Sequence, residues 1–206
     1  MRLAIGILVV LSIAVLMSMT GRGGGNFYVP VLIALGFQAH QAATTAQLIL
    51  VASASAAMLV FTKHRAVDWK LALVIDAPTD IAALFGGYYA HLFPEQMLKI
   101  IFAGLLLLAA YFMLRPVRER REYAEKRFGF WRREYRGDTY VVNLWAVLPI
   151  TAATGFVAGM VGISGGSFKV PLMVLACGVP MRVAVGTSSA MVTATALMGF
   201  IGHTAA

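Results

Sequence analysis

The chain has 206 residues, of which 60% are hydrophobic and 13% charged, and it carries a formal net charge of +8. Soluble domains average about 45–50% apolar and about 25% charged residues, so this composition excludes an ordinary soluble enzyme and favours an integral membrane protein. The positive charge does not indicate nucleic-acid binding, because nine of the 17 Lys and Arg residues lie within 115–136, between apolar runs. The single cysteine, Cys177, excludes an internal disulfide bond and a metal site made only of cysteines.

The apolar runs predict membrane spans and two half-spans. Residues 3–19 form an uncharged run at the lower limit of length for a span, with a signal peptide as the alternative interpretation. The glycines of 21–25 then break the helix, and residues 27–37 are too few to cross a hydrocarbon core of about 30 Å, so they predict a half-span. Full spans are expected at 42–62, 71–93, 97–114, 142–160 and 183–202, and a second break at 162–167 precedes a second half-span at 168–178. The predicted fold class is an all-α integral membrane protein, a polytopic helical bundle.

Two basic segments, 63–70 and 115–139, predict the orientation. They are separated by two full spans and must lie on the same side of the membrane, whereas the turn at 91–96 contains neither Lys nor Arg. The positive-inside rule therefore predicts that both segments are cytoplasmic. Charge pairs at i and i+4 within 116–127 predict a solvated helix that serves as a connector.

An internal repeat relates the two halves of the chain. Laying residue 30 over residue 171 aligns GRGGGNFYVPVL (21–32) with GISGGSFKVPLM (162–173), so each copy has a glycine-rich break followed by a half-span. Hydroxyl residues begin the next span in both copies, as AATTAQ (42–47) and AVGTSS (184–189). Two related halves that each carry a broken helix are typical of secondary transporters, whose binding site lies between the repeats. Whether the repeats are parallel or inverted stays open.

The repeat divides the chain into a first membrane repeat (1–115), a basic cytoplasmic connector (116–141) and a second membrane repeat (142–206). The second copy stops before the equivalents of the last two spans of the first, and it is therefore expected to be incomplete. This pattern indicates either a truncated product or a chain that is completed by a partner.

The glycine-rich breaks are the candidate substrate site. Glycine lets another group approach the backbone closely, and the helix that follows each break presents free N–H groups and a positive dipole end, which suit an anion. Lys169 lies within the second half-span, where a lysine faces a cavity or a counter-charge, with snorkelling to the interface as the alternative. The candidate substrate-binding residues are Gly24, Gly25, Asn26, Thr45, Ser164, Gly165, Gly166, Ser167, Lys169, Thr187 and Ser188.

Asp76 and Asp80 are candidates for proton coupling. They are four residues apart and share one face of a helix, and carboxylates within a membrane often mark proton or cation relays. The alternative is a helix shifted so that both lie near the cytoplasmic surface, since Lys70 is close to them in sequence. No two histidines have metal-ligand spacing, and the sequence contains neither G-x-S-x-G nor H-E-x-x-H. The sequence therefore predicts no metal, no cofactor and no enzymatic activity.

The stretch GMVGISGGSFKVPLMVLACGVPMRVAVGTSSAMV (159–192) resembles the signature of the sulfite exporter TauE/SafE family, also called the toluene sulfonate uptake permeases, and residues 21–47 are a weaker version of it. Residues 85–114 also resemble the closing helix pair of a family repeat. The resemblance implies a carrier in a bacterial or archaeal inner (plasma) membrane that moves sulfite, sulfonates or related small sulfur-containing anions. Arg22, Thr44 and Ser164 depart from the family pattern, as do Asp76 and Asp80, and these departures point to a different substrate or coupling ion.

Two hypotheses of function follow. The first is a secondary transporter of small anions that works by alternating access at the two helix N-termini, with proton coupling through an aspartate. The alternative is a non-transporting membrane subunit or a fragment, in which the glycines serve only helix packing. The expected partners are a small anionic substrate and the lipid bilayer, without nucleic acid, and a homo-oligomer stays open.

Overall fold

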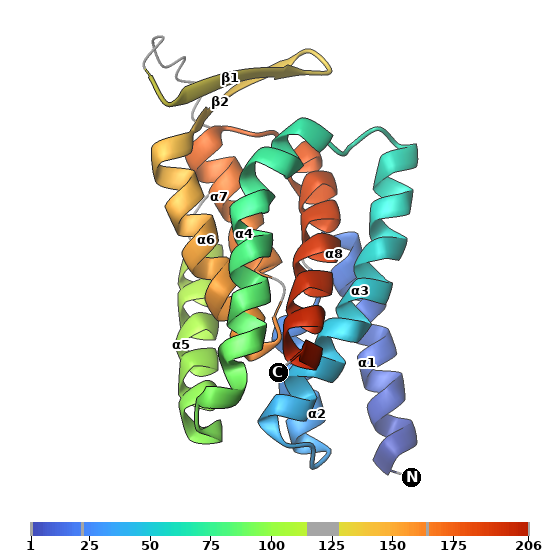
Figure 1. The fold of residues 1–206 in the computed structure, drawn as a ribbon. Coiled ribbons are helices and arrows are strands. Elements are labelled where there is room, and N and C mark those ends of the chain that lie inside the picture. The colour runs from blue at the N-terminus through green and yellow to red at the C-terminus, as the bar shows by residue number, and fades with distance from the viewer. Residues whose placement is uncertain (1, 22, 115–127, 164, 206) are drawn as a thin grey trace.

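The computed structural model describes residues 2–21, 23–114, 128–163 and 165–205. The chain forms a bundle of helices with a small β-hairpin at one end (Figure 1). The elements are α1 (Arg2–Met19), α2 (Gly25–Ala34), α3 (Ala39–Lys63), α4 (Trp69–Tyr89), the 3₁₀ turn η1 (Ala90–Leu92), α5 (Glu95–Leu114), β1 (Phe130–Tyr135), β2 (Asp138–Asn143), α6 (Leu144–Val161), α7 (Gly166–Cys177) and α8 (Met181–Ala205). This architecture confirms the predicted all-α polytopic membrane fold, to which the hairpin is an addition.

Four helices are long and apolar enough to cross a membrane within the described part of the chain: α3, α4 with η1, α6 and α8. The two predicted half-spans are short helices, α2 with 10 residues and α7 with 12. A helix rises about 1.5 Å per residue, so neither crosses a hydrocarbon core of about 30 Å.

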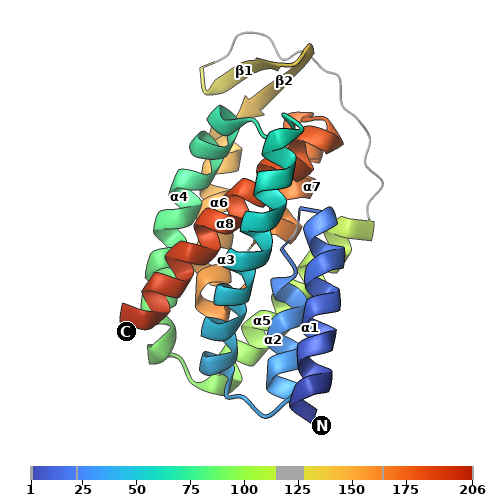
Figure 2. The same cartoon turned by 90° about the vertical axis from the view of Figure 1, so that its right-hand side faces the viewer.

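The helices alternate in direction along the chain (Figures 1 and 2). We call the end of the bundle that carries β1 and β2 the hairpin end. α1 and α3 run toward it and α2 runs away from it, whereas α6 and α8 run away from it and α7 runs toward it (Figures 1 and 2). α1, α2 and α3 of the first predicted repeat therefore point opposite to α6, α7 and α8, the helices that align with them in the second.

α4 packs closely between α6 and α8, because glycines line both crossings. A Cβ added at Gly86 would overlap the backbone of Phe156 on α6, and one added at Gly202 would overlap the backbone of α4 at Leu84. Small residues let helix backbones approach in this way, which is a main source of helix association in lipid.

The hairpin was not predicted from the sequence. β1 and β2 pair antiparallel, with Tyr135 opposite Asp138, and the two-residue turn between them has positive φ at Arg136 (55°) and Gly137 (89°). Turns with two positive φ values match the twist of a hairpin. The run of charged residues Arg132, Arg133 and Glu134 hid the alternating pattern of β1, because half-buried Arg133 is as polar as its exposed neighbours. β2 reaches Asn143, so α6 begins at Leu144 rather than at residue 142. The solvated helix predicted at 116–127 lies outside the described residues.

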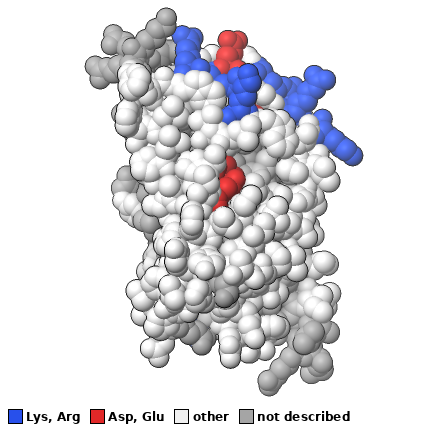
Figure 3. Space-filling model, viewed as in Figure 1, with Lys and Arg blue, Asp and Glu red and all other residues white. Residues whose placement is uncertain are grey.

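Lys and Arg side chains gather at the hairpin end on the face shown in Figure 3. Most of the rest of this face is uncharged, as a surface in contact with lipid requires. Acidic atoms emerge at mid-height, over the middle of the bundle (Figure 3). Among the described residues of the helices, the carboxylates at this depth are those of α4, namely Asp76 and Asp80.

Candidate functional site

The first turns of α2 and α7 meet inside the bundle. We call residues 20–24 the first glycine loop and residues 162–165 the second. Asn26 Nδ2 donates to Ser167 Oγ over 2.9 Å, and these two residues, 141 positions apart, are aligned with one another in the predicted repeat. Two helix N-termini therefore lie side by side, and their positive dipole ends favour a negative charge between them.

Both helices begin at a glycine that cannot cap them with a side chain. The N-cap residues Gly24 and Gly165 have left-handed backbones, with φ of 84° and 63°, and neither helix has a side-chain cap. A Cβ added at Gly165 would have ordinary contacts only, 3.8 Å from both Ala158 Cβ and Lys169 Cε. The backbone conformation requires glycine at this position, whereas close packing does not.

Other glycines of the loops do serve close packing. A Cβ at Gly21 would lie 2.9 Å from Val185 Cγ1, and one at Gly162 would lie 2.6 Å from Ala43 Cβ. Each loop thus touches the beginning of the long helix that belongs to the other half of the chain. Such reciprocal contacts are expected of two units related by a two-fold axis.

A buried cluster of charges lies next to the second glycine loop, and we call it the charge cluster: Lys169, Asp76, Asp80 and Thr195. Lys169 is 1% exposed, and its ammonium forms a salt bridge with Asp76 Oδ1 and a hydrogen bond of 2.6 Å to Thr195 Oγ1. Thr195 Oγ1 also lies 2.9 Å from Asp80 Oδ1. Lys169 therefore faces a counter-charge and does not snorkel.

The cluster holds two carboxyl groups but one ammonium group. Asp76 is buried and Asp80 half-buried, so leaving both ionised would place one uncompensated negative charge at membrane depth. A buried charge without a partner is strongly destabilising, and two carboxyl groups at close range titrate as a pair. The geometry therefore suits a proton that the two aspartates share.

The other predicted site residues are spread more widely. Gly25 and Gly166 are buried in the first turns of α2 and α7, and Thr45 is half-buried on α3. Thr187 lies nearer the hairpin end, where its hydroxyl oxygen accepts a hydrogen bond from the Asp68 backbone N–H over 3.0 Å. Ser188 Oγ is buried, and no partner for it exists among the described residues. Ser164 lies outside the described residues.

Sequence reasoning missed two polar residues of the interior, Thr195 and His203. Thr195 joins the charge cluster, while Gln47 and His203 both bond to the carbonyl oxygen of Gly159, over 3.0 and 2.9 Å. His203 lies in the last turn of α8 and is 6% exposed. Ser188 and Thr195 are seven residues apart, so their hydroxyls share one face of α8. This spacing was the signal in the sequence that could have identified Thr195.

A second network fastens the hairpin to the bundle, and we call it the hairpin lock: Asp68, Arg133, Tyr140 and Thr187. Arg133 binds the Asp68 carboxylate through Nε and Nη2, over 2.9 and 3.0 Å, and Tyr140 donates its hydroxyl to the same carboxylate. Asp68 also caps α4, accepting the backbone N–H of Lys70 over 3.1 Å. Asp68 thus joins the hairpin to α4 through its carboxylate, and its backbone N–H adds a bond to Thr187 on α8.

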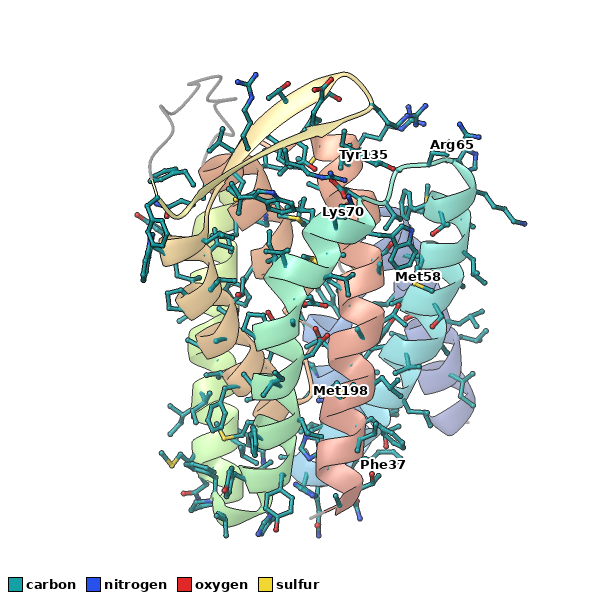
Figure 4. All side chains as sticks on the ribbon, turned by 45° about the horizontal axis from the view of Figure 1, so that its top comes forward. Phe37, Met58, Arg65, Lys70, Tyr135 and Met198 are labelled. Carbon is teal, nitrogen blue, oxygen red and sulfur yellow. The ribbon has the colours of Figure 1, made fainter. Side chains whose placement is uncertain are left out.

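The turn between α3 and α4 is held by the hairpin as well. Tyr135 donates its hydroxyl to the carbonyl oxygen of Arg65 over 3.1 Å or to that of Val67 over 2.9 Å. Figure 4 shows Tyr135 close to Arg65 at the hairpin end, with Phe37 at the opposite end of the bundle.

The lock also shifts the pKa values of its members. Burial by itself would raise the pKa of Asp68, but hydrogen bonds from Arg133, Tyr140 and the Leu71 N–H, together with the charge of Arg133, outweigh burial and hold it below its ordinary value. Burial and the neighbouring Asp68 carboxylate raise the pKa of Tyr140, and the hydrogen bond to Asp68 raises that of Arg133. The carboxylate is therefore ionised and the tyrosine neutral at physiological pH.

Comparison with known proteins agrees with this architecture. The profile of the sulfite exporter TauE/SafE family matches residues 6–206. The chain is also similar to the probable membrane transporter protein YunE of Bacillus subtilis (strain 168), with 28% identity over 201 residues, which cover 90% of this chain and 72% of the relative. No solved structure shows a significant match. The chain belongs to the sulfite exporter TauE/SafE family, a family of membrane transporters.

Proposed function

We propose that this protein is a secondary transporter of small anions, of which sulfite, sulfonates and related sulfur-containing anions are the first candidates. The observation that carries the proposal is the hydrogen bond between Asn26 and Ser167, which joins the two helix N-termini next to the buried Lys169. Backbone N–H groups, a hydroxyl, an amide and an ammonium group together form a site of donors, which suits the oxygens of a sulfur oxyanion. The family name points to the same substrate class.

Alternating access would use the two halves as inverted repeats. The opposite directions of aligned helices support this proposal (Figures 1 and 2), and so do the reciprocal contacts of Gly21 with Val185 and of Gly162 with Ala43. In transporters of this kind, one repeat rocks against the other around a site at the centre of the membrane. The Asn26–Ser167 contact would form the axis of that movement.

The hairpin end would face the cytoplasm of a cell with this protein in its inner membrane. Lys and Arg concentrate at that end (Figure 3), in the short loop 63–70 and on the hairpin. Basic residues in short loops are retained on the cytoplasmic side.

The alternative function is a membrane subunit in which the glycines serve only packing. Gly21 and Gly162 favour it, because any side chain there would overlap a neighbouring helix. Gly165 argues against it, because a Cβ there would meet no close contact, and so does the burial of a lysine beside it. Packing alone gives no reason for a charge at this depth.

The proposal is tested by anion binding to the purified protein in detergent, with a panel of sulfite, thiosulfate, methanesulfonate, sulfate, chloride and acetate. Lys169→Ala is expected to weaken binding of the preferred anion by about 10- to 100-fold, because a charge-assisted hydrogen bond contributes ~1.5–3 kcal/mol. Lys63→Ala, at the exposed end of α3, is the matched control and should bind as the wild type does.

A folded wild-type protein that binds none of these anions would contradict the carrier proposal. Equal anion affinities in the wild type and in Lys169→Ala would show that Lys169 does not take part in binding. The melting temperature of each variant in detergent shows whether a loss of binding reflects a loss of folding.

A further inference from the structure

We infer that Asp76 and the anion compete for Lys169, and that binding of the anion is coupled to uptake of a proton by the Asp76–Asp80 pair. The inference rests on the proposed function, because it names what controls that same site. It makes the protein a proton–anion symporter, in which the anion and the proton enter the site together.

Lys169 lies close to both proposed partners, Asp76 and an anion at the second glycine loop. It lies in the first turn of α7, two residues after Ser167, and a Cβ added at Gly165 would lie 3.8 Å from its Cε, in ordinary van der Waals contact. The stem of the side chain therefore passes along the second glycine loop, while the ammonium reaches Asp76 on α4. Rotation of the stem would carry the charge from Asp76 toward the second glycine loop.

The charges of the cluster balance only if a proton accompanies the anion. With one proton shared by the two aspartates, the cluster is neutral, and Lys169 is paired with Asp76. A monovalent anion that takes over Lys169 leaves Asp76 without its counter-charge, and a second proton on the aspartate pair restores neutrality. Because an uncompensated charge at this depth is costly, the exchange and the protonation favour one another.

Thr195 accommodates the aspartates in both protonation states. A hydroxyl group has one hydrogen to donate and two lone pairs, and one lone pair accepts the ammonium of Lys169. Its hydrogen can go either to Asp80 Oδ1 or to the carbonyl oxygen of Met191, each 2.9 Å away. In the first case Asp80 is ionised, and in the second a protonated Asp80 donates to Thr195.

The elements around the cluster supply few other titratable groups. α6 has none in its sequence, and α7 has Cys177 in its last turn besides Lys169. α8 carries Arg182 at the hairpin end and His203 at its other end, where the ring bonds to the Gly159 carbonyl oxygen. On α5, the side chain of Lys99 is exposed. The Asp76–Asp80 pair is therefore the group expected to take up the proton.

The test measures the affinity for methanesulfonate, whose own charge is constant, between about pH 5 and pH 8, where folded proteins are most stable. The dissociation constant of the wild type is expected to rise with pH, by up to about tenfold per pH unit when one proton accompanies each anion. In weakly buffered solution, addition of the anion should remove protons from the medium.

The Asp76→Asn variant tests whether Asp76 competes with the anion for Lys169 or only positions Lys169. If Asp76 competes with the anion, this variant binds methanesulfonate more tightly than the wild type at the upper end of the pH range. If Asp76 only positions Lys169, the variant binds more weakly at every pH, which overturns the inference. Asp138→Asn, on the exposed start of β2, is the matched control and should behave as the wild type.

Different results would contradict the proton coupling and the proposed carrier function. Anion binding without pH dependence and without proton uptake in the wild type overturns the coupling and leaves the carrier intact, and this readout needs no variant to fold. Absence of binding for every anion in folded wild-type protein overturns the proposed function and the coupling with it.

Discussion

Asp68→Ala is expected to lower the free energy of unfolding by about 4 kcal/mol. The substitution removes the partner of Arg133 and Tyr140 together with the N-cap of α4, at a site where the carboxylate is buried. Breaking a buried ion pair by removing one partner costs about 3–5 kcal/mol, and a lost N-cap adds about 1 kcal/mol. The lower part of the combined range applies, because the Arg133 side chain is 20% exposed and can be hydrated again.

The measurement is the unfolding midpoint in detergent at neutral pH. Asp138→Ala is the matched control, since Asp138 is exposed at the turn of the same hairpin, and it should change the midpoint little. Equal midpoints for Asp68→Ala and the control would show that the lock contributes nothing to stability.

The contribution of Asp68 also has a defined pH dependence. Its pKa is lower in the folded protein than the ordinary value of 3.8, so the unfolded chain binds the proton more tightly. The stabilisation is therefore complete above the unfolded pKa and is lost as the pH falls through the folded one. The difference in stability between the wild type and Asp68→Asn should be constant near neutral pH and should shrink below about pH 4. A difference that stays unchanged in acid would contradict this assignment.

Gly162→Ala is the second change for which a large loss is expected. Gly162 has a φ of 83°, which costs a residue with a side chain about 1–2 kcal/mol. The new Cβ would also lie 2.6 Å from Ala43 Cβ and 2.7 Å from the Ala43 carbonyl oxygen. The backbone of α3 must then move, and overpacking of this kind costs a further ~1–3 kcal/mol. We expect a loss of stability of about 2–5 kcal/mol in total.

Gly36→Ala separates the two costs. Gly36 lies between α2 and α3 with a φ of 100°, and a Cβ there would meet no atom within 4 Å. This control carries the backbone cost alone and should lose less stability than Gly162→Ala. The reciprocal variant Gly21→Ala should resemble Gly162→Ala, because its Cβ would overlap Val185. Equal midpoints for Gly36→Ala and Gly162→Ala would show that the second glycine loop is not packed tightly against α3.

The sequence by itself determined the helices, the breaks and the family. Apolar runs and glycines act locally, so the half-spans at 27–37 and 168–178 appear as α2 and α7 within a few residues. The signature in 159–192 likewise depends on residues close together in the chain, and the family profile confirms it. The spacing of Asp76 and Asp80 predicted that they share a helical face, and both lie beside Thr195 on α8.

Only the tertiary structure decided the roles of the charged residues. Whether Lys169 snorkels depends on a partner 93 positions earlier in the chain, and the Asp76 carboxylate supplies it. Thr187, a candidate substrate-binding residue, accepts a hydrogen bond from the Asp68 N–H, 119 positions away. The free energy of a buried charge is set by the groups around it, which come from several helices. The hairpin stayed hidden for the same reason, because its inward residues Tyr140 and Val142 belong to a buried cluster with residues of α4, α7 and α8, which they meet only in the folded chain.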